Sequence, residues 1–329
     1  MNMNAGMDIE EVLKLLADGR FHSGEELGDC LGVSRTAVWK QLKKLEPLGL
    51  PLHSVKGKGY CLEGGLELLR PETIVSGLND NARALLLELD VQTIVDSTNV
   101  RAAERVARGN AHGYVCSAEQ QTAGKGRRGR PWVSPFGKNI YLSAVWGFDG
   151  GIAVLEGLSL AVGVAVVRAL QAAGLEGLRL KWPNDVLWNG RKLAGILLEM
   201  TGDVDGYCQV VVGLGVNVSM PPASGATIDQ QWVDVQSIIG DCSRNQLMIH
   251  ILNHLLPMFK EFQAGGFSAL RPEWEQLDAY RNCVVELLTP KAAHCGVALG
   301  VNDSGAIRVR VDGHERVFSG GEISLRAAP

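Results

Sequence analysis

The stretch QQTAGKGRRGR at residues 120–130 restricts the fold more than any other part of the chain. Its three glycines match the pattern G-x-G-x-x-G of a dinucleotide-binding turn. That turn must open a helix, because the helix N-terminus holds the pyrophosphate. Here Pro131 and Pro135 follow the stretch, and proline lacks the backbone donor that a helix interior needs. We therefore exclude a dinucleotide-binding βαβ fold, and the absence of a G-x-x-x-x-G-K-[ST] sequence also excludes a P-loop.

The same stretch carries four cationic side chains, at Lys125, Arg127, Arg128 and Arg130. Glycines allow a backbone to close on a ligand, and cations neutralise anionic oxygens. The stretch therefore predicts a loop that holds a phosphate or a carboxylate. Taken alone, it is also compatible with a cationic loop that faces solvent or binds nucleic acid.

Four further polar stretches favour the ligand-binding interpretation. They are DSTN at residues 96–99, KWPND at 181–185, RKLAGIL at 191–197 and GLGVNV at 213–218. Each lies in or at the end of a predicted strand, where polar side chains can gather at one edge of a sheet. Together with the cationic loop they predict one polar pocket.

The first sixty residues predict a winged helix-turn-helix. Apolar spacing indicates a helix at residues 8–17, and Ser23 with Glu26 forms the S-x-x-E capping box of a second helix. Ser34 is a cap for a third helix, and residues 52–62 form a hairpin with a Lys-Gly-Lys-Gly tip. Helix, helix, turn, helix and basic hairpin is the plan of that DNA-binding motif.

Charge supports this interpretation. The whole chain has a net charge of −4, which excludes a globally basic nucleic-acid binder, yet residues 34–60 hold six lysines or arginines and one acid. We expect Arg35 and Thr36 near base edges and the lysines at phosphates. The alternative is a solvated helical module that binds protein. The candidate DNA contacts are Ser34, Arg35, Thr36, Lys40, Lys43, Lys44, Lys56 and Lys58.

The rest of the chain predicts two further units. A linker is expected at residues 63–71, and beyond it strand-like and helical runs alternate irregularly, which favours a mostly antiparallel sheet with helices packed on it. Residues 152–173 predict one helix, buried rather than membrane-spanning because it holds Glu156 and Arg168. Residues 282–325 predict short strands of a small barrel.

In the order in which they occur, the glycine–arginine loop, KWPND, RKLAGIL and GxGxN resemble the bifunctional biotin–protein ligases and biotin operon repressors of bacteria, and the resemblance covers the whole chain. It implies a multidomain α+β protein with a winged helix at residues 1–66. A catalytic domain like those of class II aminoacyl-tRNA synthetases and biotin ligases would occupy residues 67–277. A small SH3-like β-barrel would occupy residues 278–329.

The resemblance also implies an activity. Biotin and ATP, with Mg²⁺, would give biotinyl-5′-AMP, which passes biotin to a lysine of the biotin carboxyl carrier protein of acetyl-CoA carboxylase and forms a carbon–nitrogen bond. The adenylate would serve as co-repressor for a homodimer on biotin operator DNA. Two alternatives stay open: a biotin-sensing repressor without catalysis, and a lipoate-type ligase of the same core fold.

Site residues follow from the same resemblance. Arg127 and Lys192 would be catalytic, and Trp132 and Asn217 would hold ATP at its adenine. Mg²⁺ would be held mainly by phosphates, with Asp185 either assisting or only capping a turn. The family loop usually has Arg where this chain has Lys125, which cannot form the same planar bidentate pair. The residues implied for biotin and the adenylate are Ser97, Thr98, Asn99, Gln121, Gly124, Lys125, Gly126, Arg127, Lys192 and Gly195.

The remaining sequence features predict no further functional site. The seven cysteines form no C-x-x-C pair and are expected to be free thiols of a reducing cytoplasm. His250 and His254 lack the H-E-x-x-H pattern, so we expect no zinc. Residues 1–10 are polar and then acidic, which is not typical of a signal peptide, and we expect no membrane partner.

Overall fold

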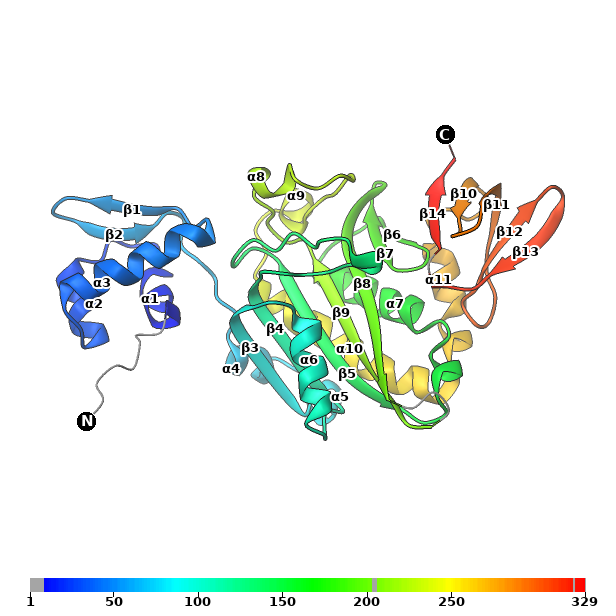
Figure 1. Ribbon diagram of the computed structural model, residues 1–329, viewed down its shortest axis with the longest axis horizontal. Coiled ribbons are helices and arrows are strands. Elements are labelled where there is room, and N and C mark those ends of the chain that lie inside the picture. The colour runs from blue at the N-terminus through cyan, green and yellow to red at the C-terminus, as the bar shows by residue number, and fades with distance from the viewer. Residues whose placement is uncertain (1–8, 203–205, 322, 329) are drawn as a thin grey trace.

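The computed structural model describes residues 9–202, 206–321 and 323–328 and places three units side by side along the long axis of the molecule (Figure 1). The N-terminal unit lies at one end, a large sheet with helices lies in the middle, and the C-terminal strands lie at the other end. The division at residues 66 and 277 stays a prediction.

The N-terminal unit has the predicted helix-turn-helix and hairpin. Its elements are α1 (Ile9–Leu16), α2 (Gly24–Leu31), α3 (Arg35–Leu42), the 3-10 helix η1 (Lys43–Leu48), β1 (Leu52–Val55) and β2 (Gly59–Leu62). The capping box is present: the Ser23 hydroxyl accepts from the Glu26 backbone, and the Glu26 side chain accepts from the Ser23 backbone. Gly32 ends α2 in the left-handed conformation, with φ of 65°. Asp8, the first residue of the predicted first helix, lies outside the described residues.

The central unit is built on a seven-stranded sheet in the order β3-β4-β5-β9-β8-β7-β6. Only the β3–β4 pair is parallel, and the other neighbouring pairs are antiparallel, as predicted. The strands are β3 (Glu88–Val95), β4 (Tyr114–Gln121), β5 (Ile140–Phe148), β6 (Leu178–Lys181), β7 (Asp185–Trp188), β8 (Arg191–Gly202) and β9 (Cys208–Val216).

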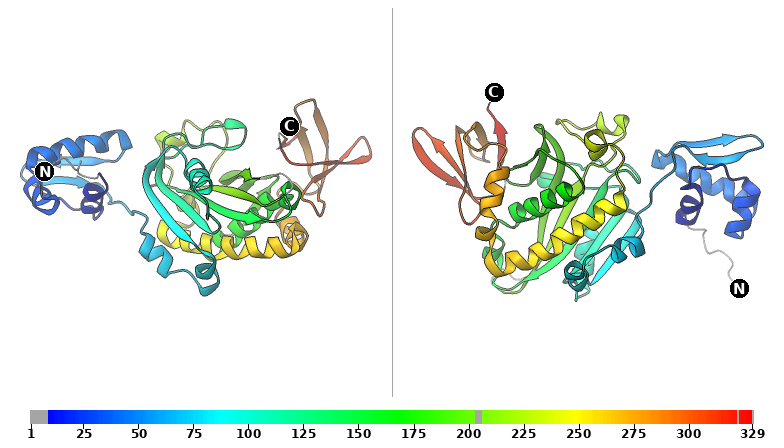
Figure 2. Two further views of the ribbon diagram at one scale, coloured as in Figure 1. Left: turned by 60° about the horizontal axis from the view of Figure 1, so that its bottom comes forward. Right: turned by 180° about the vertical axis from the view of Figure 1, so that it is seen from behind.

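Helices cover both faces of this sheet. On one face lies α6 (Thr98–Ala107), and on the other lie α7 (Leu158–Ala172) and α10 (Arg244–Gly265) (Figure 2). The strand pattern explains this, because alternate residues of one strand point to opposite faces. Val145 packs with the α6 cluster, whereas its neighbour Trp146 packs in the large core with α7 and α10. The shorter helices are α4 (Pro71–Ser76), α5 (Asp80–Leu85), α8 (Pro222–Gly225), α9 (Val235–Ile239) and α11 (Arg271–Leu277), with the 3-10 helices η2 (Arg127–Gly129), η3 (Ile152–Leu155) and η4 (Phe267–Ala269).

The prediction of a single helix at residues 152–173 is wrong in one respect, because the structure has two helices there, η3 and α7, with an interruption between them. Gly157 stands at the break with φ of 80°, and a Cβ there would lie 2.5 Å from the Phe267 Cβ. The close approach of the Phe267 side chain is therefore possible only beside glycine. By length and composition the stretch Ile152–Ala172 could cross a membrane, but more than half of it is buried inside the protein, as for a core helix.

The C-terminal unit is a five-stranded antiparallel sheet in the order β13-β12-β11-β10-β14. The indole of Trp182, in the central unit, donates to the Gly305 carbonyl at 3.0 Å and joins the two units. The strands are β10 (Val284–Leu288), β11 (Ala293–Val301), β12 (Ile307–Val311), β13 (His314–Phe318) and β14 (Ser324–Ala327).

The predicted linker is bound to the central unit over its second half. The Glu67 carboxylate accepts from the Arg244 backbone at 2.6 Å and the Ser243 hydroxyl at 2.5 Å, at the start of α10. Burial raises the pKa of Glu67, but hydrogen bonds from Ser243, Asn245 and Arg244 outweigh burial and hold it below its usual range. The linker is therefore anchored rather than free.

Candidate functional site

A cavity of about 360 Å³ lies where the strands of the central sheet meet the glycine–arginine loop and the C-terminal strand β14. The structure brings most of the predicted site residues to its wall. Gly124 is not among them; a Cβ at Gly124 would lie 2.8 Å from Gln121 Nε2, so this glycine lets the loop pack on Gln121. The predicted residues in the wall are Ser97, Thr98, Asn99, Gln121, Lys125, Gly126, Arg127, Trp132, Asp185, Lys192, Gly195 and Asn217.

One part of the wall is polar and uncharged. Thr98 and Asn99 open α6 and are only 3% and 5% exposed. The side-chain oxygen Oε1 of Gln121 accepts from the Thr98 backbone at 2.9 Å, so β4 holds the start of α6. Ser143 Oγ lies 2.7 Å from Thr98 Oγ1 and 2.6 Å from Asn99 Oδ1. These bonds fix the side chains in advance for a neutral polar ligand.

The sequence motifs did not identify two residues of this network. Ser143 lies in the middle of β5 with no motif around it, and Glu199 lies in β8 beyond RKLAGIL. The Glu199 carboxylate accepts from the Asn99 amide at 2.6 Å. Only the alternation of β5 and β8 could have signalled that these side chains face α6.

The neighbouring part of the wall is a seat for the Trp132 indole. Gly195 of β8 and Gly215 of β9 are paired directly across the two strands. A Cβ at Gly215 would lie 2.4 Å from Trp132 Cε2, and one at Gly195 would lie 3.0 Å from Trp132 Cζ3. The indole N–H is buried, and among the described residues it has no hydrogen-bond partner. A ligand acceptor would satisfy this donor.

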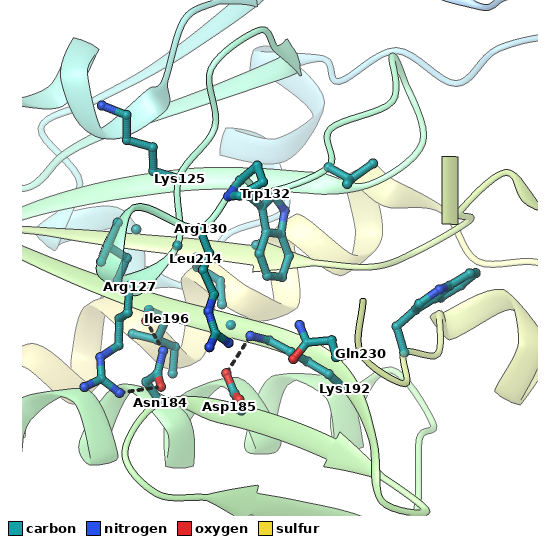
Figure 3. Close-up of a pocket in the computed structure, with 18 of the residues that line it drawn as sticks. Lys125, Arg127, Arg130, Trp132, Asn184, Asp185, Lys192, Ile196, Leu214 and Gln230 are labelled. Atoms are coloured by element: carbon teal, nitrogen blue, oxygen red, sulfur yellow. Dashed lines mark hydrogen bonds and ion pairs between the residues drawn. The ribbon is translucent and has the colours of Figure 1, made fainter. Parts of the chain in front are cut away.

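Cations from several elements surround the other side of the cavity. Lys192 Nζ lies 2.7 Å from Asp185 Oδ1 and 5.3 Å from the centre of the Trp132 ring. Figure 3 shows Arg130 directed toward the Lys192–Asp185 pair and Lys125 directed away from it. The substitution of lysine at position 125 therefore falls outside this cationic cluster.

Arg127 lies at the boundary with the C-terminal unit. Its guanidinium donates to Asn184 Oδ1 at 3.2 Å, to the Ile323 carbonyl at 3.2 Å and to the Gly321 carbonyl. Burial lowers the pKa of Arg127 most, Asp185 opposes this, and Arg128 and Arg130 lower it further. The C-terminal segment thus holds the loop over the cavity.

Lys181 adds to the positive charge, although the sequence did not single it out as a ligand contact. Burial lowers the pKa of Lys181 most, Asp185 opposes this, and the nearby cations lower it further. Those cations are Lys192, Arg326 and Arg130. A cluster that repels its own charges in this way is suited to an anionic ligand.

Asn217 lies in the cavity wall and also bonds to the backbone around it. Its amide donates to the Val233 carbonyl at 3.2 Å and the Lys192 carbonyl at 3.4 Å. It lines the cavity, but it also joins β8 to the segment before α9. Asn217 therefore holds the backbone that carries Lys192.

The predicted DNA contacts form an exposed face on the N-terminal unit. Ser34 caps α3 by accepting from the Ala37 backbone at 3.3 Å. Trp39, which sequence reasoning passed over, lies on the same face. The exposed residues of this face and of the hairpin are Ser34, Arg35, Thr36, Lys40, Lys43, Lys44, Lys56 and Lys58.

Comparison with known proteins finds a family match for the N-terminal unit and for the central unit. Residues 91–217 match the model of the biotin/lipoate A/B protein ligase family, and residues 9–61 match an HTH domain. The chain is 37% identical to the bifunctional ligase/repressor BirA of Escherichia coli, over 97% of this chain and 97% of the relative. It is 30% identical to the Bacillus subtilis protein of the same name, over 92% of this chain and 94% of the relative.

A solved structure agrees with these relatives. The biotin protein ligase of Aquifex aeolicus, in complex with biotin and ATP, superposes with a TM-score of 0.62 at 27% identity. It covers 74% of this chain and 100% of its own length.

Proposed function

Because the chain belongs to the family of bifunctional biotin protein ligases and repressors, we propose that it activates biotin with ATP and transfers it to a lysine of the biotin carboxyl carrier protein of acetyl-CoA carboxylase. The observation that carries this proposal is the cavity itself. A neutral hydrogen-bonding wall, at Thr98 and Asn99, lies beside a cationic wall at Lys192, Arg130 and Lys181.

This pairing suits the two half-reactions. In the first, a biotin carboxylate oxygen attacks the α-phosphorus of ATP, a new carbon–oxygen–phosphorus link forms, and pyrophosphate leaves. The two reactants are both anions, so fixed cations must lie between them. In the second, the lysine amine attacks the acyl carbon, loses a proton, and AMP leaves. A carbon–nitrogen bond results.

We propose that Lys192 and Arg127 stabilise the negative charge that develops in the transition state of the first step. Lys192 would contact the carboxylate and α-phosphate oxygens, because its ammonium is held in the wall by Asp185 at 2.7 Å. Arg127 would close the loop over the adenylate and exclude water, which would otherwise hydrolyse it.

The remaining site residues receive roles from their positions. Ser97, Thr98, Asn99 and Gln121 would bind biotin, the loop at Lys125 and Gly126 would cover it, and Gly195 would approach its bicyclic ring. Trp132 would stack on the adenine of ATP, and its unpartnered N–H would meet an acceptor. Asn217, which also lines the cavity, would lie near the adenine, and Gly124 would act on the ligand through the loop that it positions.

The cavity is also compatible with Mg²⁺. Asp185 is a carboxylate in the cavity wall, and carboxylate oxygens with phosphates and water form the usual magnesium shell. Mg²⁺ would neutralise phosphate charge when bound, with Asp185 as its candidate protein ligand. The Lys192 contact leaves one Asp185 oxygen for this purpose.

We propose that the HTH unit binds biotin operator DNA as a homodimer, with biotinyl-5′-AMP as co-repressor. α3 would enter the major groove and the β1–β2 hairpin would contact phosphates. A dimer would span two half-sites, and ligand binding would shift the chain toward the dimer. The cytoplasm is the compartment where operator, ATP and carrier protein meet.

A biotin-transfer assay tests the enzymatic proposal. We expect transfer of labelled biotin to a carrier domain only with ATP, together with pyrophosphate release. Pyrophosphate release without transfer would support adenylate formation but would contradict the proposed carrier protein as the acceptor. No reaction in either assay would favour a non-catalytic biotin sensor. Inhibition by lipoate at equal concentration would favour a lipoate-type ligase.

A gel shift tests the repressor proposal. Operator affinity should rise with biotin plus ATP and fall when acceptor protein is added. Removal of residues 1–62 should abolish DNA binding and leave biotin transfer measurable. A shift that ignores both additions would contradict co-repression by the adenylate.

A further inference from the structure

An aromatic side chain stands in the middle of the cationic face of α3. Trp39 is 50% exposed. Arg35 precedes it and Lys43 follows it by four residues each, so the three side chains lie on one side of the helix. The adjacent side of α3 faces the core of the N-terminal unit and is buried, with Val38 at 0% and Leu42 at 2% exposure.

Exposure of one apolar side chain is common on protein surfaces and by itself indicates nothing. The surroundings of Trp39 are what distinguish it. Arg35, Thr36 and Lys40 are exposed on the same or the adjacent turn of the helix. The large ring therefore stands within the surface whose positive charge is complementary to DNA.

Lys43 holds the ring in place. Its ammonium lies 5.5 Å from the centre of the Trp39 ring and 3.0 Å from the Glu46 carboxylate. A cation over an indole face is attracted to it. Lys43 is therefore a residue that positions Trp39, in addition to any phosphate contact that it makes.

The major groove offers an indole one apolar group. Base edges there carry hydrogen-bond donors and acceptors, and thymine alone adds a methyl group. A large apolar side chain placed against donors and acceptors would leave those groups without water or partners, which is costly. A methyl group is the base surface in the groove that the apolar part of the indole can cover without burying a donor or an acceptor.

We propose that Trp39 reads the operator by packing its indole against the 5-methyl group of a thymine in the major groove. This inference rests on the proposed operator binding, and it adds a specificity-determining residue to the contacts expected from charge.

The test uses the full-length protein with biotin and ATP. A duplex is selected from a random pool, and each of its thymines is then replaced singly by uracil, which lacks only the methyl group. Wild-type affinity should fall about fourfold at one or two positions, the effect of one buried methyl group. Trp39→Ala should bind the selected duplex more weakly and lose the difference between thymine and uracil at those positions.

Two controls distinguish loss of the thymine contact from a general loss of positive charge and from misfolding. Lys40→Ala should weaken binding on thymine and uracil duplexes alike and keep the uracil effect. Trp39→Gln, which retains a long helix-forming side chain, should behave as Trp39→Ala does. Both Trp39 variants should retain the wild-type circular dichroism spectrum and thermal unfolding transitions, which shows that the N-terminal unit is folded, and they should also retain wild-type biotin transfer.

Three outcomes would overturn the proposal. If the affinity of the wild-type protein is unchanged by every uracil replacement, the protein makes no contact with a thymine methyl group. A uracil effect that persists in both Trp39 variants belongs to another residue. If wild-type protein selects no duplex at all, the proposed operator binding itself fails, and the role of Trp39 fails with it.

Discussion

Lys192 and Asp185 form an ion pair in the wall of the cavity, with 2.7 Å between the ammonium nitrogen and the carboxylate oxygen. Their side chains are 16% and 14% exposed. A flexible lysine held in this way has already lost most of its side-chain freedom before a ligand binds. The pair thus places a positive charge where the two anionic substrates must meet.

Lys192→Met should therefore lower adenylate formation by roughly 100-fold or more, the usual effect of removing a fixed group that stabilises transition-state charge. Biotin-dependent exchange between pyrophosphate and ATP measures this step. Lys260→Met is the matched control, because Lys260 is exposed on α10. An unchanged exchange rate in Lys192→Met would remove this residue from the proposed chemistry.

Arg127→Gly should release the adenylate into solution. The guanidinium joins the loop to Asn184 and to the Ile323 carbonyl, and glycine cannot make either bond. We expect biotin on lysines of a bystander protein such as albumin, and free biotinyl-5′-AMP by chromatography. Arg127→Lys should leak less, because it keeps the charge but not the planar fork. Strict labelling of the carrier by Arg127→Gly would refute the retaining role of the loop.

The ion pair between Arg244 and Glu119 should control the stability of the central unit. The two side chains are each 4% exposed and lie 2.7 Å apart, and Glu119 also accepts from the Leu69 backbone at 2.6 Å. Arg244→Met leaves a buried carboxylate unpaired and should lower the free energy of unfolding by about 3–5 kcal/mol.

The double variant Arg244→Met/Glu119→Gln should recover part of this loss, because glutamine is neutral and still accepts from Leu69. Urea unfolding of the three proteins measures the difference. A double variant as unstable as the single one would mean that lost packing, and not the unpaired charge, is responsible.

Asp278 should make stability depend on pH. Burial raises the pKa of Asp278 to about 6, a backbone hydrogen bond from Tyr280 opposes this, and among the described residues its second oxygen, Oδ2, has no hydrogen-bond partner. The folded state thus prefers the protonated acid. Above this pKa the ionised group destabilises the fold, by about 3 kcal/mol for a shift of this size.

Stability should accordingly rise as the pH falls from 7.5 to 5. Asp278→Asn, which is neutral at both values, should be more stable than wild type at pH 7.5, and roughly half of this difference should remain at pH 5, because the unfolded carboxyl group is still ionised there. Thermal unfolding at the two pH values measures this. Equal pH dependence in both proteins would assign it to other groups.

Local signals in the sequence predicted the local structure. Ser23 and Glu26 specify the start of α2 within four residues, and Gly32 specifies its end. The motifs that predicted the cavity did so because each lies at the beginning or the end of a strand, and neighbouring strand ends meet. The sheet could thus be predicted as mostly antiparallel without its strand order.

Long-range contacts could not be predicted in the same way. The C-terminal segment that accepts from Arg127 is almost two hundred residues away along the chain. The break at Gly157 depends on the ring of Phe267, which is equally invisible to periodicity. Such contacts depend on how units pack, and a period of two or of 3.6 residues carries no information about that.

Gly213 and Gly215 of β9 should separate the two ligand subsites. A Cβ at position 213 would lie 2.3 Å from Asn99 Oδ1, whereas one at position 215 would lie 2.4 Å from Trp132 Cε2. Gly213→Ala should therefore raise KM for biotin and Gly215→Ala should raise KM for ATP. Each increase should be about 5- to 150-fold, the equivalent of 1–3 kcal/mol of overpacking.

Steady-state biotin transfer with each substrate varied in turn measures both constants. Gly265→Ala is the control, because its Cβ would meet only Ala269 at 3.4 Å, far from the cavity lining. If both cavity variants raised both KM values equally, the alanine at either position would be distorting β9 as a whole. The wall formed by Asn99 and the seat of Trp132 would then be one site rather than two, and the assignment of biotin to the first and adenine to the second would have to be abandoned.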